Sequence, residues 1–548
     1  MPKIAIGGRS GDFFGERILI AESPASQDEQ IEPPVAADWS PGWWTLGVVL
    51  VVLGFGAFVG RFRGHTVDDA FITFRYVQNW LAGEGLVFNP GERVEGYTNF
   101  LWVVLLAPFG AMGYALEEAA KVLGVGFGAG CIFHVYRIGK RLGASPTNAL
   151  IGPLILAFNP AFVVWACGGL ETAMMAFWVT AGFGRLLTDH HEERCSFWPG
   201  VYLGLATLTR PDGIVLAGVM LVFQAIQAQR QRSAVLGFLG SLAVYAVIVG
   251  GHLMFRLAYY GEWLPNTFYA KVDPHGQQLT RGLRYAGEFC MDTGWWLPLL
   301  MLTGVVAVRG AASICLGVAV AAYSGYVIYV GGDGLGMYRF FVPILPLMAL
   351  AGQQTVAGIR ELLPGARTRG ATVATAVLLL IGLGWQTRFA FVGKQHDSVV
   401  LATNETNTWK RVGLWFGENA GPTESIAMIP AGAIPFYSGL AAIDMVGLND
   451  KTIARATVET VGAAVQPGHE KHATDYVLSR EPTYIVIGVY SLMAELPAKA
   501  SIRVLYPAER ELVDHPGFLS AYGPQVAETP EGYFIYYRRA EPTTRTAK

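Results

Sequence analysis

Residues 43–76 read WWTLGVVLVVLGFGAFVGRFRGHTVDDAFITFRY, an apolar run followed closely by two aspartates. The apolar run at 42–60 is long enough to cross a bilayer, because a helix of about 20 apolar residues spans the hydrocarbon core. Further runs of this kind lie at 117–136, 147–166, 172–188, 197–209, 213–229, 233–255, 294–308, 311–330, 340–358 and 370–387. The sequence therefore predicts a multi-span α-helical membrane protein with about eleven transmembrane helices.

The composition agrees with this class. Of the 548 residues, 52% are hydrophobic and 15% are charged, which is more apolar surface than one soluble core can bury. The net charge of −2, with no basic stripe, argues against a nucleic-acid partner. The five cysteines are scattered singly, so neither a disulfide framework nor a cysteine metal site is expected.

The distribution of charge divides the chain into three expected regions. Residues 1–40 have mixed charge and predict a disordered cytoplasmic tail, and residues 41–390 contain the apolar runs. Charges become frequent after Lys394, and residues 391–548 predict a soluble α/β domain. Within it we expect a helix at 403–418 and strands at 425–429, 441–445 and 484–488, with a last strand at 533–537 able to pair antiparallel.

A shorter apolar stretch, 100–112, decides the topology. If it crossed the membrane, the basic segments 137–141, 230–232 and 360–369 would face outward, against the positive-inside rule. If it lies in the outer interface, all three are cytoplasmic, and we adopt this reading. The outer loops are then 61–116, 167–171, 210–212, 256–293 and 331–339, and the C-terminal domain is extracytoplasmic, on a bacterial inner (plasma) membrane.

The acidic pair Asp68 and Asp69 follows the first span directly. Adjacent carboxylates repel each other, which raises the pKa of one of them and suits it to act as a base. Two adjacent carboxylates are also able to bind a metal ion together. The alternative is that Asp68 caps the following helix while Asp69 sits in its first turn. We favour a catalytic role for both. No cofactor is expected to be required, and a divalent cation at the pair stays open.

The other outer loops repeat acids, cations and aromatics on one membrane face. A sugar phosphate needs cations for its phosphate and polar or aromatic groups for its sugar. The phosphate candidates are Arg210, Lys271 and Arg339, with Arg75 as a further one. The sugar or acceptor candidates are Glu95, Tyr97, Asn99, Glu171, Asp212, Asn266 and Asp333. The competing interpretations are interfacial snorkelling for the cations, a helix-dipole role for Glu171 and a turn role for Asp212.

Two motifs stand out in the C-terminal region, DMVGLND at 444–450 and GHEKH at 468–472. Histidines three residues apart beside a glutamate are able to bind metal, but the spacing matches no strong zinc pattern. We therefore expect a surface loop at 468–472.

The ordered motifs resemble a known family. DDAFITFRYVQNW, NPGERVEGYTNFLW, GGLETAMM, LTRPDG, YYGEWLPNTFYAK, GGDGLGMYRFFVPILP, DMVGLND and GHEK are similar to the C-type integral-membrane glycosyltransferases, in particular the branch of the mycobacterial terminal arabinofuranosyltransferase. The resemblance implies the C-type fold, acidic catalytic residues and two interfacial helices in the first outer loop, and a polyprenyl-phosphate leaving group. Matching by motif puts Asp68 and Asp69 in the acidic positions.

These observations predict an enzyme of cell-envelope biogenesis. It would transfer a sugar, arabinofuranose by resemblance, from a polyprenyl-phosphate carrier to an extracytoplasmic glycan acceptor. One alternative is a polyprenyl-phosphate hexose transferase acting on a protein, lipid or glycan. The other is a lipid-linked sugar transporter, which would place its ionisable groups near the bilayer midplane rather than at one face.

Overall fold

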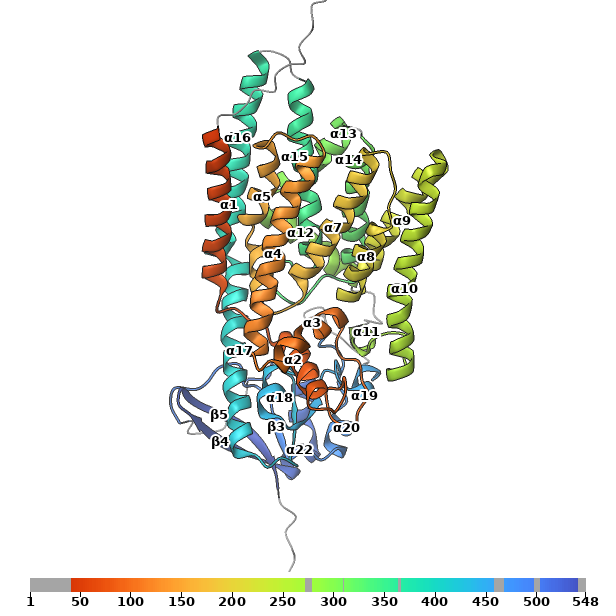
Figure 1. The fold of residues 1–548 in the computed structure, drawn as a ribbon. Coiled ribbons are helices and arrows are strands. Elements are labelled where there is room, and N and C mark those ends of the chain that lie inside the picture. Colours follow the sequence, from red (N-terminus) through yellow and green to blue (C-terminus); the bar gives the residue numbers. More distant parts are fainter. Residues whose placement is uncertain are drawn as a thin grey trace, which may run out of the picture.

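The computed structural model describes residues 41–271, 278–308, 310–362, 366–457, 468–496 and 503–540. A bundle of long helices forms most of the molecule, and a smaller α/β part covers one end of it (Figure 1). The tail expected at residues 1–40 lies outside the described residues.

Each apolar run that the sequence marks as a span coincides with a helix of the bundle, or with two in the case of 147–166. The helices are α1 Pro41–Phe62, α4 Leu116–Arg141, α5 Ile151–Ala157, α6 Pro160–Cys167, α7 Thr172–His191, α8 Trp198–Thr209, α9 Gly213–Arg230, α10 Val235–Tyr260, α13 Trp296–Val308, α14 Ala311–Tyr329, α15 Leu345–Leu362 and α16 Ala366–Thr387. Short 3-10 turns lie at η1 Asn148–Leu150, η2 Arg232–Ala234, η3 Arg339–Ile344 and η4 Arg388–Ala390. On α1, Val52 and Leu53 are each 63% exposed, which suits contact with lipid tails.

Within the described residues, six helices are long and apolar enough to cross a membrane. A seventh span results if α5 and α6, bent by 60°, are counted together. The bend lies at Asn159 and Pro160, because a proline disfavours helix in the residue before it. Asn159 then starts α6 by accepting a hydrogen bond from the Phe162 N–H at 3.0 Å. The count of six or seven is lower than the eleven expected, since α8 and α13 have only 12 and 13 residues.

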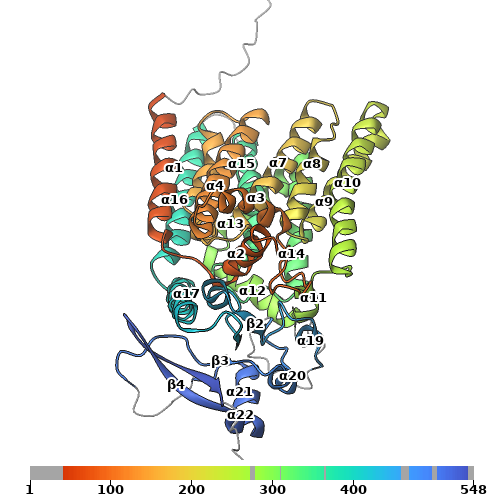
Figure 2. The same ribbon diagram turned by 60° about the horizontal axis from the view of Figure 1, so that its bottom comes forward.

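Several short helices lie at the end of the bundle that faces the α/β part. They are α2 Asp68–Leu81, α3 Phe100–Ala111, α11 Asn266–Lys271 and α12 Gln278–Thr293. Figure 2 shows α2 and α11 close to the α/β part, with α3 just behind α2. The 12 residues of α3 rise about 18 Å, against about 30 Å of hydrocarbon, so α3 is too short to cross alone. This length fits the non-spanning reading of 100–112.

The α/β part begins with α17 Lys394–Asn419 and contains one five-stranded sheet of order β2-β1-β3-β5-β4. The strands are β1 Ser425–Met428, β2 Ala441–Asp444, β3 Tyr484–Val486, β4 Tyr522–Thr529 and β5 Gly532–Arg539. The short helices are α18 Ala433–Ser438, α19 Lys451–Ala454, α20 Thr474–Ser479, α21 Pro507–Asp514 and α22 Pro516–Ala521. β1 pairs parallel with β2 and β3, whereas β5 pairs antiparallel with β3 and β4.

The predicted helix at 403–418 and the four predicted strands are confirmed, and the antiparallel pairing of the last strand is confirmed as well. Strand β4 was missed. It is an edge strand whose burial does not alternate, and it contains Gly523 and Pro524, so its sequence lacks the period-two apolar pattern of a strand.

Candidate functional site

A cavity of about 410 Å³ opens where α14, α11 and the loops at the end of the bundle meet. Nine of the residues predicted from sequence line it: Asp69, Tyr97, Asn99, Glu171, Arg210, Asp212, Lys271, Asp333 and Arg339. They come from loops that are far apart in the chain. The structure therefore brings most of the predicted residues to one place.

Arg210 lies between two buried carboxylates of this cavity. Its guanidinium contacts Glu171 at 3.0 Å and Asp212 at 3.1 Å. Tyr323 also donates to Asp212, at 2.5 Å, and the Asn99 amide donates to Glu171 at 2.8 Å. Both acids stand at helix N-caps without a side-chain capping hydrogen bond, and their carboxylates instead contact Arg210. The network holds Arg210 at a fixed position with its charge compensated.

Arg339 forms the second ion pair of the cavity. Its Nε lies 2.6 Å from Asp333, and its guanidinium lies 5.4 Å from the ring of Phe340. The Arg210 guanidinium lies 4.9 Å from the same ring. Phe340 thus supports two guanidinium groups, which attract an aromatic face electrostatically.

Asp69 and Lys271 differ from these pairs. Within the described part of the chain, neither side chain has a hydrogen bond or ion pair, although both line the cavity. Burial lowers the pKa of Lys271, and the charge of Asp69 opposes that shift. Among the described residues, the cavity thus presents one carboxylate and one ammonium group with no hydrogen-bond or ion-pair partner, and both are placed to contact a ligand.

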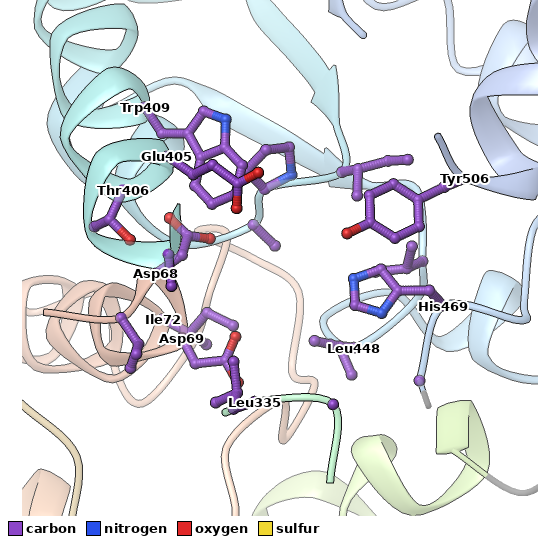
Figure 3. Close-up of a pocket in the computed structure, with 18 of the residues that line it drawn as sticks. Asp68, Asp69, Ile72, Leu335, Glu405, Thr406, Trp409, Leu448, His469 and Tyr506 are labelled. Carbon is purple, nitrogen blue, oxygen red and sulfur yellow. The ribbon is translucent and has the colours of Figure 1, made fainter. Parts of the chain in front are cut away.

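A second cavity, of about 240 Å³, lies between the bundle and the α/β part (Figure 3). Five residues line both cavities: Asp69, Ile72, Lys271, Asp333 and Leu448. The remaining wall of the second cavity includes Glu405, Trp409, His469, Tyr490 and Tyr506. The two spaces thus meet at Asp69 and Lys271.

Asp68 lines only the small cavity, whereas Asp69 lines both. Its carboxylate accepts hydrogen bonds from the backbone N–H groups of Gly432 at 2.9 Å and Ala433 at 2.8 Å, at the start of α18. It does not cap its own helix α2, whose N-cap is Val67, so the capping alternative was wrong about which helix is capped. Burial raises the pKa of Asp68 to about 7, and the charge of Asp69 adds to the rise. The direction of this shift is the one expected from the sequence, and burial rather than the neighbouring charge is its main cause.

Three predicted residues lie outside the linings of both cavities. Arg75 is buried and donates to the backbone carbonyls of Phe88 and Leu440, both at 2.7 Å, so it joins α2 to the α/β part. Glu95 forms an ion pair with Arg256 at 2.5 Å. The amide of Asn266 donates to backbone carbonyls of the 444–450 loop. Each of these side chains holds neighbouring segments together.

Both C-terminal motifs are at least partly buried, whereas a surface loop was expected at 468–472. Asp444 is buried, and its carboxylate accepts hydrogen bonds from the backbone of Val446, Gly447 and Asn449. The loop it shapes presses against the first outer loop, where a Cβ on Gly96 would lie 1.9 Å from Asn449 Oδ1. A buried carboxylate is stable only when it accepts hydrogen bonds of this kind, and the local sequence does not reveal these donors.

Glu470, in the second motif, is buried and accepts a hydrogen bond from Arg281 at 2.9 Å. Arg281 lines the large cavity and was not predicted. Across the residues that the structure describes, no three histidine, cysteine or acidic side chains lie close enough together to hold a metal ion. A cation at Asp68 and Asp69 would therefore need further ligands from the substrate or from water.

The chain is similar to several known proteins. A domain of unknown function, DUF8728, matches residues 398–536. The terminal beta-(1->2)-arabinofuranosyltransferase of Mycobacterium tuberculosis is 29% identical over 283 residues, which are 47% of this chain and 42% of that protein. The protein of the same name from Corynebacterium glutamicum is 25% identical over 455 residues, 72% of this chain and 63% of that protein. The matches span less than two thirds of either relative.

Two solved structures share the fold. ArnT from Cupriavidus metallidurans, bound to undecaprenyl phosphate, superposes with a TM-score of 0.56 at 15% identity, covering 91% of this chain and 98% of ArnT. AglB from Archaeoglobus fulgidus, an oligosaccharyltransferase in complex with an inhibitory peptide and a dolichol-phosphate, gives 0.53 at 12% identity, covering 91% and 75%. The C-type glycosyltransferase fold expected from the motifs is confirmed, and so is the resemblance to terminal arabinofuranosyltransferases.

Proposed function

We propose that this chain is a membrane glycosyltransferase that moves arabinofuranose from a polyprenyl-phosphate carrier to a glycan acceptor. The observation that carries the proposal is the junction of the two cavities at Asp69 and Lys271. A transferase needs a donor and an acceptor to meet at one reacting group. Two spaces that share a carboxylate and an ammonium group, neither of which has a partner among the described residues, meet this need.

The large cavity suits the donor. Its wall includes Tyr326, Tyr329 and Val330, at the end of the candidate span α14, so a lipid chain has an apolar approach from the bundle. Lys271 has no anionic partner among the residues that the structure describes, and it is the first candidate for the phosphate. Arg210 and Arg339 add positive charge, although their ion pairs already compensate part of it.

The reaction exchanges one bond for another at the anomeric carbon. The acceptor oxygen bonds to that carbon, the carbon–oxygen bond to phosphate breaks, and the polyprenyl phosphate leaves with the electron pair. In an inverting reaction Asp69 takes the hydroxyl proton. In a retaining reaction the Asp69 carboxylate first displaces the phosphate, and the acceptor then displaces the carboxylate. Cations near the phosphate stabilise its growing charge in both cases.

The proposal includes a topology. All eleven apolar runs cross the inner membrane, including the shorter helices α8 and α13, and α3 lies in the outer interface. The basic segments 137–141 and 230–232 are then cytoplasmic, and the two cavities and the α/β part are extracytoplasmic. The positive-inside rule supports this orientation, and labelling of single cysteines from each side of the membrane tests it.

The decisive experiment compares donors. The purified full-length protein is incubated with polyprenyl-phosphoryl arabinofuranose, mannose or glucose and with arabinan and peptide acceptors. The names of the two relatives favour arabinose, so we expect transfer from that donor only. Transfer from a hexose donor would refute arabinofuranose as the transferred sugar and leave the glycosyltransferase activity in place. Binding of the lipid phosphate with no transfer from any donor would refute the enzyme and favour a transporter. The linkage in the product distinguishes inversion from retention.

A further inference from the structure

The small cavity contains groups that the donor reaction leaves unused. Its outer wall comes from one face of α17, where Ser398, Leu401, Ala402, Glu405, Thr406 and Trp409 follow each other at helical spacing. Glu405 is the charged residue of this face, and Figure 3 shows its carboxylate directed into the cavity. Within the described residues, Glu405 has no hydrogen bond or ion pair. A half-buried carboxylate in this state is available to accept hydrogen bonds from a ligand.

Aromatic and imidazole rings held at fixed orientations form further parts of the lining. The rings of His469 and Tyr506 stack with centroids 4.5 Å apart, and Figure 3 shows the Tyr506 hydroxyl directed into the cavity. Trp409 donates its ring N–H to the Val489 carbonyl at 2.6 Å, and Tyr490 donates to Glu509 at 2.8 Å. Because their polar atoms are engaged outside the cavity, these two rings present apolar surface to a ligand.

The shape and position of this space restrict the ligand. At about 240 Å³ the cavity is smaller than the roughly 300–1,000 Å³ of pockets for drug-sized ligands, so it suits a group of about one sugar ring. Its lining combines aromatic faces with carboxylate, imidazole and hydroxyl groups, which suits a ring bearing several hydroxyls. The large cavity has the apolar approach for a lipid, whereas the small one is bounded by the α/β part.

We propose that the small cavity is the acceptor subsite, where Glu405 and Tyr506 bind the hydroxyls of the terminal neutral sugar of the glycan and direct one hydroxyl to Asp69. This inference rests on the proposed function and adds residues of the matched domain to the site. Glu405 and Tyr506 are positioning residues, because the bond exchange takes place at Asp69.

The test uses full-length protein carrying Glu405→Gln or Tyr506→Phe, assayed for transfer at varied acceptor and varied donor. Replacing Glu405 removes charge-assisted hydrogen bonds, so the acceptor KM should rise by about tenfold or more. Removing the single Tyr506 hydroxyl should give a smaller rise, and the donor KM should not change in either variant. Glu418→Gln is the matched control, because Glu418 is exposed on the same helix and lines neither cavity.

The outcomes separate this subsite from the proposed function. Normal transfer with acceptor KM values within twofold of the parent protein in both variants would overturn the subsite and leave the function intact. If the parent protein transfers no sugar, saturation-transfer NMR with an arabinose oligosaccharide still decides. Binding that is lost in Glu405→Gln and kept in Glu418→Gln would support a glycan subsite, and no binding to the parent protein would overturn it.

Discussion

The acidic motif offers a sharp test, because replacing Asp69 is predicted to reduce the rate of transfer, whereas replacing Asp68 is predicted to reduce the stability of the fold. In Asp69→Asn the shape is kept and no described hydrogen bond is lost, so the fold should be unaffected. In Asp68→Asn one of the two accepting oxygens becomes an NH2 group, which faces the N–H of Gly432 or Ala433. A buried donor then lacks an acceptor, and the fold should weaken.

The magnitudes follow from these contacts. Leaving one backbone N–H unsatisfied costs about 1–3 kcal/mol, so Asp68→Asn should lower the free energy of unfolding by about that amount. Loss of a general acid or base costs about 10²–10⁴-fold in rate, which is about 3–5 kcal/mol of activation free energy. Asp69→Asn should therefore lose at least about 100-fold in kcat while its stability stays within about 0.5 kcal/mol of the parent protein.

The assay pairs sugar transfer with thermal unfolding in the same detergent. The expected result is an inactive, stable Asp69→Asn protein and a less stable Asp68→Asn protein that keeps measurable turnover. The reasoning is refuted if Asp69→Asn retains more than about a tenth of the parent kcat, since the loss of a base exceeds that amount. It is also refuted if Asp68→Asn is inactive with an unchanged melting temperature, because Asp68 would then act in the reaction itself.

Three further changes test the remaining groups. Lys271→Gln should raise the donor KM by about tenfold or more by removing a charge-assisted contact to phosphate, and an equal rise in the acceptor KM would contradict that role. Burial raises the pKa of Asp68 to about 7. Below that pH the protonated carboxyl oxygen is a hydrogen-bond donor that faces the N–H donor of Gly432 or Ala433. The pH profile of kcat/KM should therefore fall on the acid side near pH 7, and Asp68→Asn should remove that fall if the assignment is right. Gly432→Ala should destabilise the protein by about 1–3 kcal/mol, because the new Cβ would lie 1.9 Å from the Asp68 carbonyl oxygen; an unchanged melting temperature would show that α18 shifts freely.

Most residues of the large cavity that were predicted could be found in the sequence, because they belong to polar motifs at the ends of apolar runs. Charge asymmetry placed the outer loops on one side, and nine predicted residues meet in that cavity. The sequence did not separate the cations by role. Arg75, Arg210 and Lys271 have the same sign, yet Arg75 binds backbone carbonyls, Arg210 is held by two acids and Lys271 lines both cavities.

Several residues that line only the small cavity, among them Glu405 and Trp409, were not predicted from the sequence, for a related reason. Glu405 and Trp409 lie on a helix whose pattern resembles that of any half-buried helix, and no motif marks them. The spacing of the α17 face was present in the sequence, but only contact with the bundle shows which face is covered. The motifs at 444–450 and 468–472 were noticed, but their burial depends on partners far away in the chain, such as Arg281.

The sequence by itself determined the membrane class, the helices of the bundle, most strands of the sheet and the acidic motif. These features depend on local apolar pattern and on charge near each span, which are properties of short segments. Tertiary structure alone decided that Asp68 holds α18 while Asp69 faces two cavities. Adjacent residues on a helix point about 100° apart. What packs around α2 therefore decides that Asp68 binds the start of α18 and lines only the small cavity, whereas Asp69 lines both cavities.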